Sequence, residues 1–138
     1  MAKESGLGVT TLSIDDSAGA AQAVKNDITQ FNLSTPSGVQ DVTGIDKSAM
    51  ERLLLLADGQ LQITYVFNDA ANQIHAVLKN YRTILAGQEG RTTSLAHSGQ
   101  TLAMELLFND YPLTRAADGS LTGQATGQLA DGTIPAWS

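Results

Sequence analysis

Apolar and polar residues alternate strictly in several segments of this chain, and this period of two constrains the fold more than any other feature. Leu61, Ile63 and Tyr65 alternate with Gln and Thr, and apolar residues take every second position from Leu102 to Phe108. Successive side chains of a β-strand point to opposite faces, so this pattern predicts strands with one buried face. Such strands are typical of antiparallel sheets that cover a core on one side. The sequence therefore predicts a mainly β protein.

The rest of the chain adds further strands and a single helix. A flanking helix is predicted over about residues 69–81, because apolar residues recur at helical spacing from Ile74 to Tyr81 and Asn68 or Asp69 can cap it. Asp-Gly pairs beside three of the strand patterns signal tight turns. Further strands are predicted at Thr10–Asp15, Ile28–Leu33, Arg91–Ala96 and Leu113–Ala117, with a weak return arm at Ala20–Asn26.

The middle of the chain departs from this alternation. Residues 34–44 have no clear period and are rich in turn-forming residues, so we expect a long loop over about residues 34–60. Loops of this length are usually functional or disordered. Within it, Ser48 and Glu51 have the spacing of a capping box ahead of an apolar run. Local rules therefore predict a short helix here, ended by Gly59.

The segment from Leu121 to Leu129 separates two kinds of residue by face. Its odd positions hold Leu, Gly or Ala, and its even positions are neutral and polar. A face of small residues lets a neighbouring layer approach closely, and a row of Thr and Gln can hydrogen-bond without strong attraction to a charged ligand. Two interpretations stay open, an ordinary two-sided surface strand and a strand whose small face packs closely on a neighbouring layer. The positions of the polar face are Thr122, Gln124, Thr126 and Gln128.

Length and composition suggest one domain that contacts other proteins. The 138 residues predict a single domain over residues 1–138, with a flexible N-terminal arm over about residues 1–8. Charged residues make up 16% of the chain, whereas about 25% is typical. Charge depletion is found at the centres of protein–protein interfaces. A subunit that meets copies of itself and a monomeric β-protein with Thr-rich strands both fit this composition.

Charge and the lack of cysteine exclude several classes of protein. Without Cys, the chain has no disulfide scaffold, cysteine-based zinc site, iron–sulfur cluster or thiol nucleophile. The net charge of −6 argues against binding to anionic membranes or, by neutralising phosphates, to nucleic acid. The N-terminal residues show no secretory signal, and the longest strictly apolar run, Leu53–Ala57, is too short to cross a membrane. We expect a chain that is cytosolic when made and binds no membrane.

No group of residues points to catalysis or to a bound metal or cofactor. His75 and His97 have no acidic partners at metal-ligand spacing, and the Asp15–Asp16 turn lacks the pattern of a calcium loop. Glu105 and the pair Glu51–Arg52 could act as acid–base groups in a cleft, but single carboxylates on strands are more often surface or interface charges. No nucleophile motif, phosphate loop or dinucleotide fingerprint is present. The sequence therefore predicts neither an enzyme nor a cofactor or metal site.

Short motifs along the chain resemble those of one protein family. They are Ser34–Gly44 with its Asp-Val-Thr triplet, Ala57–Asp69 ahead of the predicted helix and, near the end, Gly127–Leu129, Asp131–Thr133 and Pro135–Trp137. In this order, from about residue 9 to the end, the chain resembles the tail tube proteins, or major tail proteins, of long-tailed bacteriophages. The resemblance is to the proteins of siphophages, whose tails do not contract.

The resemblance implies an antiparallel β-sandwich or barrel-like tail tube fold with one flanking helix. It implies hexameric rings whose inner sheets join into one continuous barrel, and rings stacked into a conduit for DNA ejection. It also implies an extended course for residues 48–56, against the helix that local rules predict. The expected location is the virion tail, made and assembled in the bacterial host cytoplasm.

The resemblance also implies a set of partners. These are copies of the chain itself, a tape measure protein, a tail terminator and distal tail or baseplate proteins, with double-stranded DNA only as transient non-specific cargo. The inner tube of a contractile tail or injection system is an alternative with the same fold, which a companion sheath protein would distinguish. A monomeric β-sandwich binding module is an alternative from another class, and it predicts an exposed site on loops and no polymerisation.

Loops and termini are free to reach another subunit or ring, so contacts are expected from the N-terminal arm, from the long loop and from the C-terminal end. Trp137 is equally suited to closing the edge of the core and to packing on a neighbouring subunit. The candidate contact residues are Thr35, Pro36, Ser37, Val39, Gln40, Asp41, Val42, Ile134, Pro135 and Trp137.

The polar face of the segment Leu121–Leu129 is the candidate surface of a bore or of a contact between subunits. The candidate lumen-facing residues are Thr122, Gln124, Thr126 and Gln128.

Overall fold

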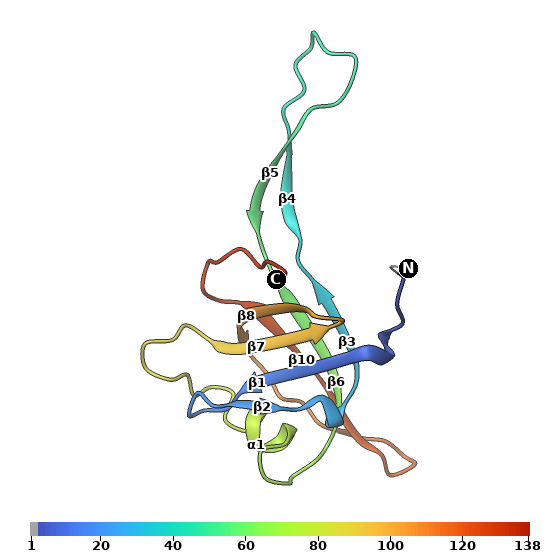
Figure 1. The fold of residues 1–138 in the computed structure, drawn as a ribbon, viewed down its shortest axis with the longest axis vertical. Coiled ribbons are helices and arrows are strands. Elements are labelled where there is room, and N and C mark those ends of the chain that lie inside the picture. The colour runs from blue at the N-terminus through green and yellow to red at the C-terminus, as the bar shows by residue number, and fades with distance from the viewer. Residues whose placement is uncertain (1–2) are drawn as a thin grey trace.

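The computed structural model describes residues 3–138 and is built mainly from antiparallel strands (Figure 1). Its single α-helix in the described residues, α1, is short. The strands are β1 Val9–Asp15, β2 Ala21–Ala23, β3 Ile28–Ser34, β4 Ser37–Asp41, β5 Arg52–Ala57, β6 Gln60–Val66, β7 Arg91–His97, β8 Gln100–Phe108, β9 Thr114–Arg115 and β10 Leu121–Leu129; α1 is Ile74–Leu78, and short 3₁₀ turns cover Gly6–Gly8 and Lys25–Asp27.

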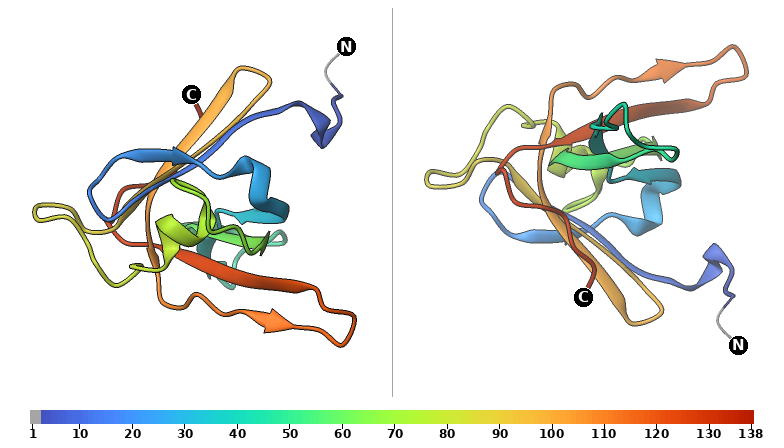
Figure 2. Two further views of the ribbon diagram at one scale, coloured as in Figure 1. Left: turned by 90° about the horizontal axis from the view of Figure 1, so that it is seen from below. Right: turned by 90° about the horizontal axis from the view of Figure 1, so that it is seen from above.

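Eight strands form one sheet, in the order β2-β1-β7-β8-β10-β6-β3, with β9 paired to β10. The sheet folds over one core, so that β1 and β8 lie on one side of the body and β10 and β9 on the other (Figure 2). β1 and β3 do not pair with each other. Lys25 Nζ instead donates to the carbonyl oxygens of Val9 and Thr10 on β1. The predicted antiparallel sandwich or barrel-like fold is confirmed.

The alternating apolar residues form the core, as their period predicts. They come from both halves of the folded sheet, and each fully buried aliphatic or aromatic side chain contributes roughly 1.5–3 kcal/mol to folding. The largest of them are Tyr65, Leu12, Ile14, Leu61, Ile63, Ile74, Leu78, Leu102 and Leu106.

The predicted flanking helix is present, but α1 covers only Ile74–Leu78 and not residues 69–81. Asn72 has a φ of 62°, so the chain turns there and does not wind into a helix. The carboxylate of Asp27 accepts a hydrogen bond from the amide of Ile74, the first helical residue, at 3.0 Å. Asp27 therefore caps the helix from a segment distant in sequence. After the helix, the guanidinium of Arg91 binds carbonyl oxygens at its C-terminal end. Tertiary contacts therefore set both ends.

β4 and β5 form a two-stranded arm that projects from the body, at the end opposite α1 (Figure 1). The helix that local rules predict over residues 48–56 is wrong, and the extended course is right, because residues 52–57 are β5. The Thr43 hydroxyl accepts the Glu51 amide at 2.8 Å, and the Val42 amide donates to the Glu51 carbonyl at 3.0 Å. An isolated helix this short is marginal in water. Pairing β5 with β4 instead gives the main-chain groups of both strands hydrogen-bond partners.

The arm continues the β3–β6 pair rather than starting a separate unit. β3 runs into β4 across Pro36, which has no amide hydrogen for a ladder, and β5 runs into β6 across Gly59. The Asp58 amide donates to the Pro36 carbonyl at 2.8 Å and holds the two crossings together. A Cβ on Gly59 would lie 2.9 Å from the sulfur of Met104, so a larger residue where the arm meets the body would require the Met104 side chain to shift. The expected loop over residues 34–60 is thus mostly an ordered arm.

Residues 1 and 2 of the expected N-terminal arm lie outside the described residues. Residues 3–8 are exposed, and the Glu4 carboxylate accepts the Ser98 hydroxyl at 2.7 Å and lies 3.7 Å from His97 Nε2. None of the helices in residues 3–138 is long and apolar enough to cross a membrane.

Candidate functional site

The strand β10 turns its small residues to the core and its polar residues outward. A Cβ on Gly123 would lie 2.7 Å from the ring of Tyr65, and a Cβ on Gly127 would lie 2.9 Å from Leu106 Cδ1. Ala125, between them, is 2% exposed. The close approach of β10 to the core therefore requires these small residues. The even positions 122, 124, 126 and 128 consequently lie on the outer face of the sheet.

The register of β3, β6 and β10 extends this polar surface into three rows. Thr64 lies between Gln30 and Gln124, Gln62 between Asn32 and Thr126, and Gln60 between Ser34 and Gln128. Every residue in these rows is an amide or a hydroxyl, and none carries a charge. We call this surface the neutral face; it consists of Gln30, Asn32, Ser34, Gln60, Gln62, Thr64, Gln124, Thr126 and Gln128.

The side chains of the neutral face are free to bind something else. Among the described residues, none of the nine makes a side-chain hydrogen bond within the chain. At its margins, Thr122 pairs with Val66 and Gln128 with Leu107, so the adjoining positions are uncharged as well. The neutral face can therefore form hydrogen bonds with water or with another molecule, and none of its side chains carries a charge that would bind an ion.

The sheet segment that carries the neutral face has a free edge along β3 and a short free edge at β9, while β8 pairs with β10 over residues 127–129. β3 pairs only with β6, and β9 pairs only with β10. Along β3, the structure shows no main-chain partner for the outer edge within residues 3–138. By contrast, Lys25 Nζ and the Val24 amide donate hydrogen bonds to main-chain carbonyl oxygens along β1. Unpaired strand edges can accept a strand from another chain.

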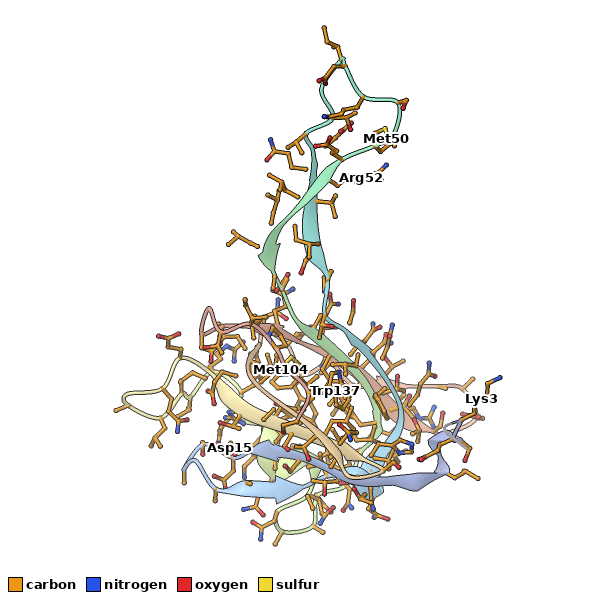
Figure 3. All side chains as sticks on the ribbon, turned by 45° about the horizontal axis from the view of Figure 1, so that its top comes forward. Lys3, Asp15, Met50, Arg52, Met104 and Trp137 are labelled. Atoms are coloured by element: carbon orange, nitrogen blue, oxygen red, sulfur yellow. The ribbon has the colours of Figure 1, made fainter. Side chains whose placement is uncertain are left out.

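The arm exposes apolar side chains on both of its faces. Val39 pairs with Leu54, which puts these two on one face, and Leu53, which pairs with Gln40, lies on the other. Leu55 lies against Gly38, on the same face as Leu53. Leu54 and Leu56 are 78% and 90% exposed. Figure 3 shows Met50 and Arg52 far out on the arm, away from Met104 and Trp137 in the body. A leucine run of this kind in water is typical of a surface that another protein covers.

The candidate contact residues fall into two separate groups. Thr35 and Pro36 lie at the base of the arm, and the positions from Ser37 to Val42 lie along β4 and just beyond it. Ile134, Pro135 and Trp137 belong to the C-terminal segment, which lies against β8. Pro135 of the second group lies close to Gly59, where the arm meets the body. Their role in contacts remains a prediction.

Trp137 lies on the edge of the body and is half-exposed. It pairs with Leu102 of β8, and Ser138 exchanges two main-chain hydrogen bonds with Thr101 at 2.9 Å. The C-terminal segment thus adds a short strand beside β8, while one side of the indole stays in water.

Charged groups are buried away from the neutral face. Arg91 is 3% exposed and donates to the carbonyls of Val77, Asn80 and Thr83. Burial, with help from the nearby charges of Glu105 and Asp16, raises the pKa of Asp15 above its ordinary value of 3.8. The hydrogen bonds of Arg91 support the fold, whereas burial makes the charged form of Asp15 unfavourable.

The residues considered for metal or acid–base chemistry are scattered over the body. His75 lies 3.2 Å from the Tyr111 hydroxyl, and His97 lies beside Glu4. The Thr92 hydroxyl donates to the Glu105 carboxylate. Within residues 3–138 no three His, Asp or Glu side chains gather where they could hold a metal ion.

By sequence, no protein family and no curated protein matches the chain. By structure, it matches a chain of the tail of an empty gene transfer agent particle with C6 symmetry, with a TM-score of 0.71 and 15% identity over 99% of this chain and 98% of that one. It also matches a chain of the virion of a native gene transfer agent particle, with a TM-score of 0.69 and 13% identity over 99% of both chains. The chain has a tail-protein fold. The resemblance to tail proteins is confirmed at the level of the fold.

Sequence reasoning found the β10 side of the neutral face and missed the rest. The six positions on β3 and β6 also show polar alternation, in Gln30 and Asn32 and from Gln60 to Thr64. What the sequence does not contain is the order of the strands, which brings β3, β6 and β10 together within the tail-protein fold.

Proposed function

We propose that this chain is a structural virion protein, a tail tube subunit whose copies form hexameric rings that stack into a conduit for DNA ejection. The observation that carries the proposal is the arm, because a free monomer would leave its leucines in water on both faces. The shared fold with a chain of a C6-symmetric tail supports it.

The free edges at β3 and at the short strand β9 supply a means of closing a ring. The outer edge of β3 in one copy is available to a strand at the β9 edge of the next, and such a contact uses different surfaces on the two partners. Contacts of this kind repeat around an axis and close into a ring when the rotation fits. The arm continues β3 and β6 out of this sheet, so it is placed to contact a neighbouring ring.

The proposed setting follows from this role. The subunit would belong to the virion tail of a siphophage-like particle and would be assembled in the cytoplasm of the bacterial host. Its partners would be a tape measure protein inside the tube, a tail terminator at one end and distal tail or baseplate proteins at the other. A sheath protein made by the same particle would instead identify the inner tube of a contractile tail.

Electron microscopy of the purified chain, together with its mass by light scattering over a range of concentrations, tests this proposal. We expect rings or tubes with a central hole, formed alone or on addition of tail initiator proteins. A chain that stays at 14.5 kDa under both conditions would contradict the proposal and favour a monomeric binding module.

A further inference from the structure

We infer that the C-terminal segment, residues 130–138, is a latch closed by a single proton that two carboxyl groups of the sheet hold between them. These groups belong to Asp15 and Glu105, on either side of Thr92. When the proton leaves, the segment lifts from the sheet. The inference goes beyond the proposed function, because it concerns a movement within one chain. The pH thus sets whether the predicted contact residues of this segment lie against the body or are available to another chain.

Asp15, Thr92 and Glu105 lie side by side on the face of the sheet that points away from the core. Thr92 pairs with Glu105, and Ile14 pairs with the buried Thr93, which places Asp15 level with Thr92. The Thr92 hydroxyl donates to the Glu105 carboxylate and is also a hydrogen-bond partner of Asp15. A hydroxyl has one hydrogen, so it can serve only one of two carboxylates. A proton on Asp15 removes this conflict, because the acid can donate to Thr92 while Thr92 donates to Glu105.

The surroundings of Asp15 favour its protonated form. Its side chain is 7% exposed, and burial, followed by the charges of Glu105 and Asp16, raises its pKa. The amide and hydroxyl of Thr92 act in the opposite direction, with a smaller effect. The guanidinium of Arg91 is also near, but its hydrogens are donated to main-chain carbonyls. Loss of the proton therefore leaves two negative charges on either side of Thr92.

The carboxylate of Glu105 faces a cavity beneath the C-terminal segment. The cavity measures about 220 Å³, and residues 131 and 133–135 of the segment form part of its wall. Within residues 3–138, Glu105 Oε2 is buried and accepts no hydrogen bond. Asp131 adds another carboxylate to the wall, and its Oδ1 accepts the Thr133 amide at 3.0 Å. A buried carboxylate without partners is costly, so lifting the segment, which admits water to Oε2, relieves the repulsion.

The C-terminal segment is attached to the sheet mainly at its two ends. At its start the Ala130 amide donates to the Glu105 carbonyl at 3.0 Å, and at its end Ser138 exchanges two main-chain hydrogen bonds with Thr101 at 2.9 Å. The indole of Trp137 is half-exposed. The part between the two ends spans the cavity. Release at the C-terminal end is thus a local opening that leaves the pairing of the sheet strands intact.

Fluorescence of Trp137 measures the latch, because it is the only tryptophan in the sequence. Trp137 pairs with Leu102, roughly 10 Å from Glu105 along β8, and it lies apart from Asp15 (Figure 3). The indole therefore responds to release of the segment rather than directly to the proton. Quenching by acrylamide is followed from about pH 4 to about pH 9 on chains that light scattering shows to be unassembled.

We expect the quenching constant of the native chain to rise with pH in a single transition. A carboxyl group whose pKa is raised in the closed state stabilises that state at low pH, and this stabilisation is lost as pH rises. The transition should therefore lie above pH 3.8, the ordinary value for Asp15. The constant should rise about twofold, because the half-exposed indole becomes fully exposed.

Variants at each carboxyl group remove the transition if the latch is its cause. Asp15→Asn carries an amide that can donate a hydrogen bond at every pH, and Glu105→Gln removes the second charge. Both should keep the low quenching constant over the whole range, and if one does not fold, the other decides alone. Asp118→Asn changes an exposed carboxylate in the turn between β9 and β10 and should show the native transition. His97→Gln removes a titratable group from the groove beside the indole and should keep the transition as well.

Each remaining outcome would overturn the latch. A native quenching constant that stays flat with pH would do so, as would a transition that survives in both Asp15→Asn and Glu105→Gln. Loss of the transition in His97→Gln would assign the signal to the histidine. A far-ultraviolet circular dichroism spectrum that changes at the same pH would show unfolding of the whole body instead. The measurements require no tubes, so a failure to assemble contradicts the proposed function and leaves the latch standing.

Discussion

At the scale of single residues, Arg91 holds the C-terminal end of α1 and the turn after it against the sheet. Its guanidinium is 3% exposed and donates to carbonyls at the end of α1 and in the following turn. Arg91→Met should lower the free energy of unfolding by about 3 kcal/mol, because it leaves buried carbonyl oxygens without donors. Urea denaturation monitored by circular dichroism measures this. Arg115→Met, at an exposed position, should change it by less than about 0.5 kcal/mol, and equal losses would refute the role of Arg91.

Asp15 makes the stability depend on pH. Its pKa is raised by burial and by Glu105 and Asp16, so its contribution is present below the unfolded pKa and is lost as pH rises through the folded pKa. Asp15→Asn should therefore be more stable than the native chain near neutral pH, and this advantage should disappear below about pH 4. Thermal melts of both proteins across pH measure the difference. An advantage that stays constant with pH would show that ionisation of Asp15 is not its cause.

At the scale of elements, β10 can lie against the core only with glycine at position 123. A Cβ there meets the Tyr65 ring at 2.7 Å and the carbonyl oxygen of Pro112. Gly123→Ala should cost about 3 kcal/mol of stability, since a strand and a ring must move apart. Gln124→Ala, one residue on and facing outward, should cost far less. Chemical denaturation of the two variants decides this, and similar losses would contradict the packing of β10.

The arm carries the opposite prediction, because under the proposed function its leucines serve assembly and not the fold of the monomer. Leu54→Ser with Leu56→Ser should leave the unfolding free energy within about 0.5 kcal/mol of the native value and should abolish tubes. Leu85→Ser changes another exposed leucine, outside the arm, and should leave assembly intact. Light scattering and electron microscopy follow both variants. Normal tubes from the double variant would contradict the role of the arm.

The elements also differ in how well the sequence predicts them, and for a physical reason. The strands β6, β8 and β10 are predicted because their own residues alternate between two kinds with a period of two. The helix over 69–81 is shortened because its ends depend on Asp27 and Arg91, which are distant in sequence. The capping-box pattern at Ser48 and Glu51 fails because the segment pairs with β4. A local sequence pattern does not show contacts between residues that are distant in the sequence.

At the scale of the whole molecule, the same limit applies to the candidate site. The polar side of β10 is visible in the sequence, but the neutral face exists only because β3, β6 and β10 are neighbours in the sheet. The resemblance to tail tube proteins supplied that fold in outline, and the structural match to a chain of a C6-symmetric tail bears it out. How the copies meet depends on surfaces that no single-chain pattern specifies.

Cysteine accessibility in assembled tubes tests the central claim most directly, because the native chain has no Cys. Thr126→Cys, on the neutral face, and Ser94→Cys, on the other half of the sheet, are each exposed to a small maleimide and to a maleimide coupled to a protein too large to enter the tube. We predict that the thiol at 126 reacts with the small reagent alone and that the thiol at 94 distinguishes the two reagents far less. Equal reaction of the thiol at 126 with both reagents would contradict a tube whose lumen Thr126 faces.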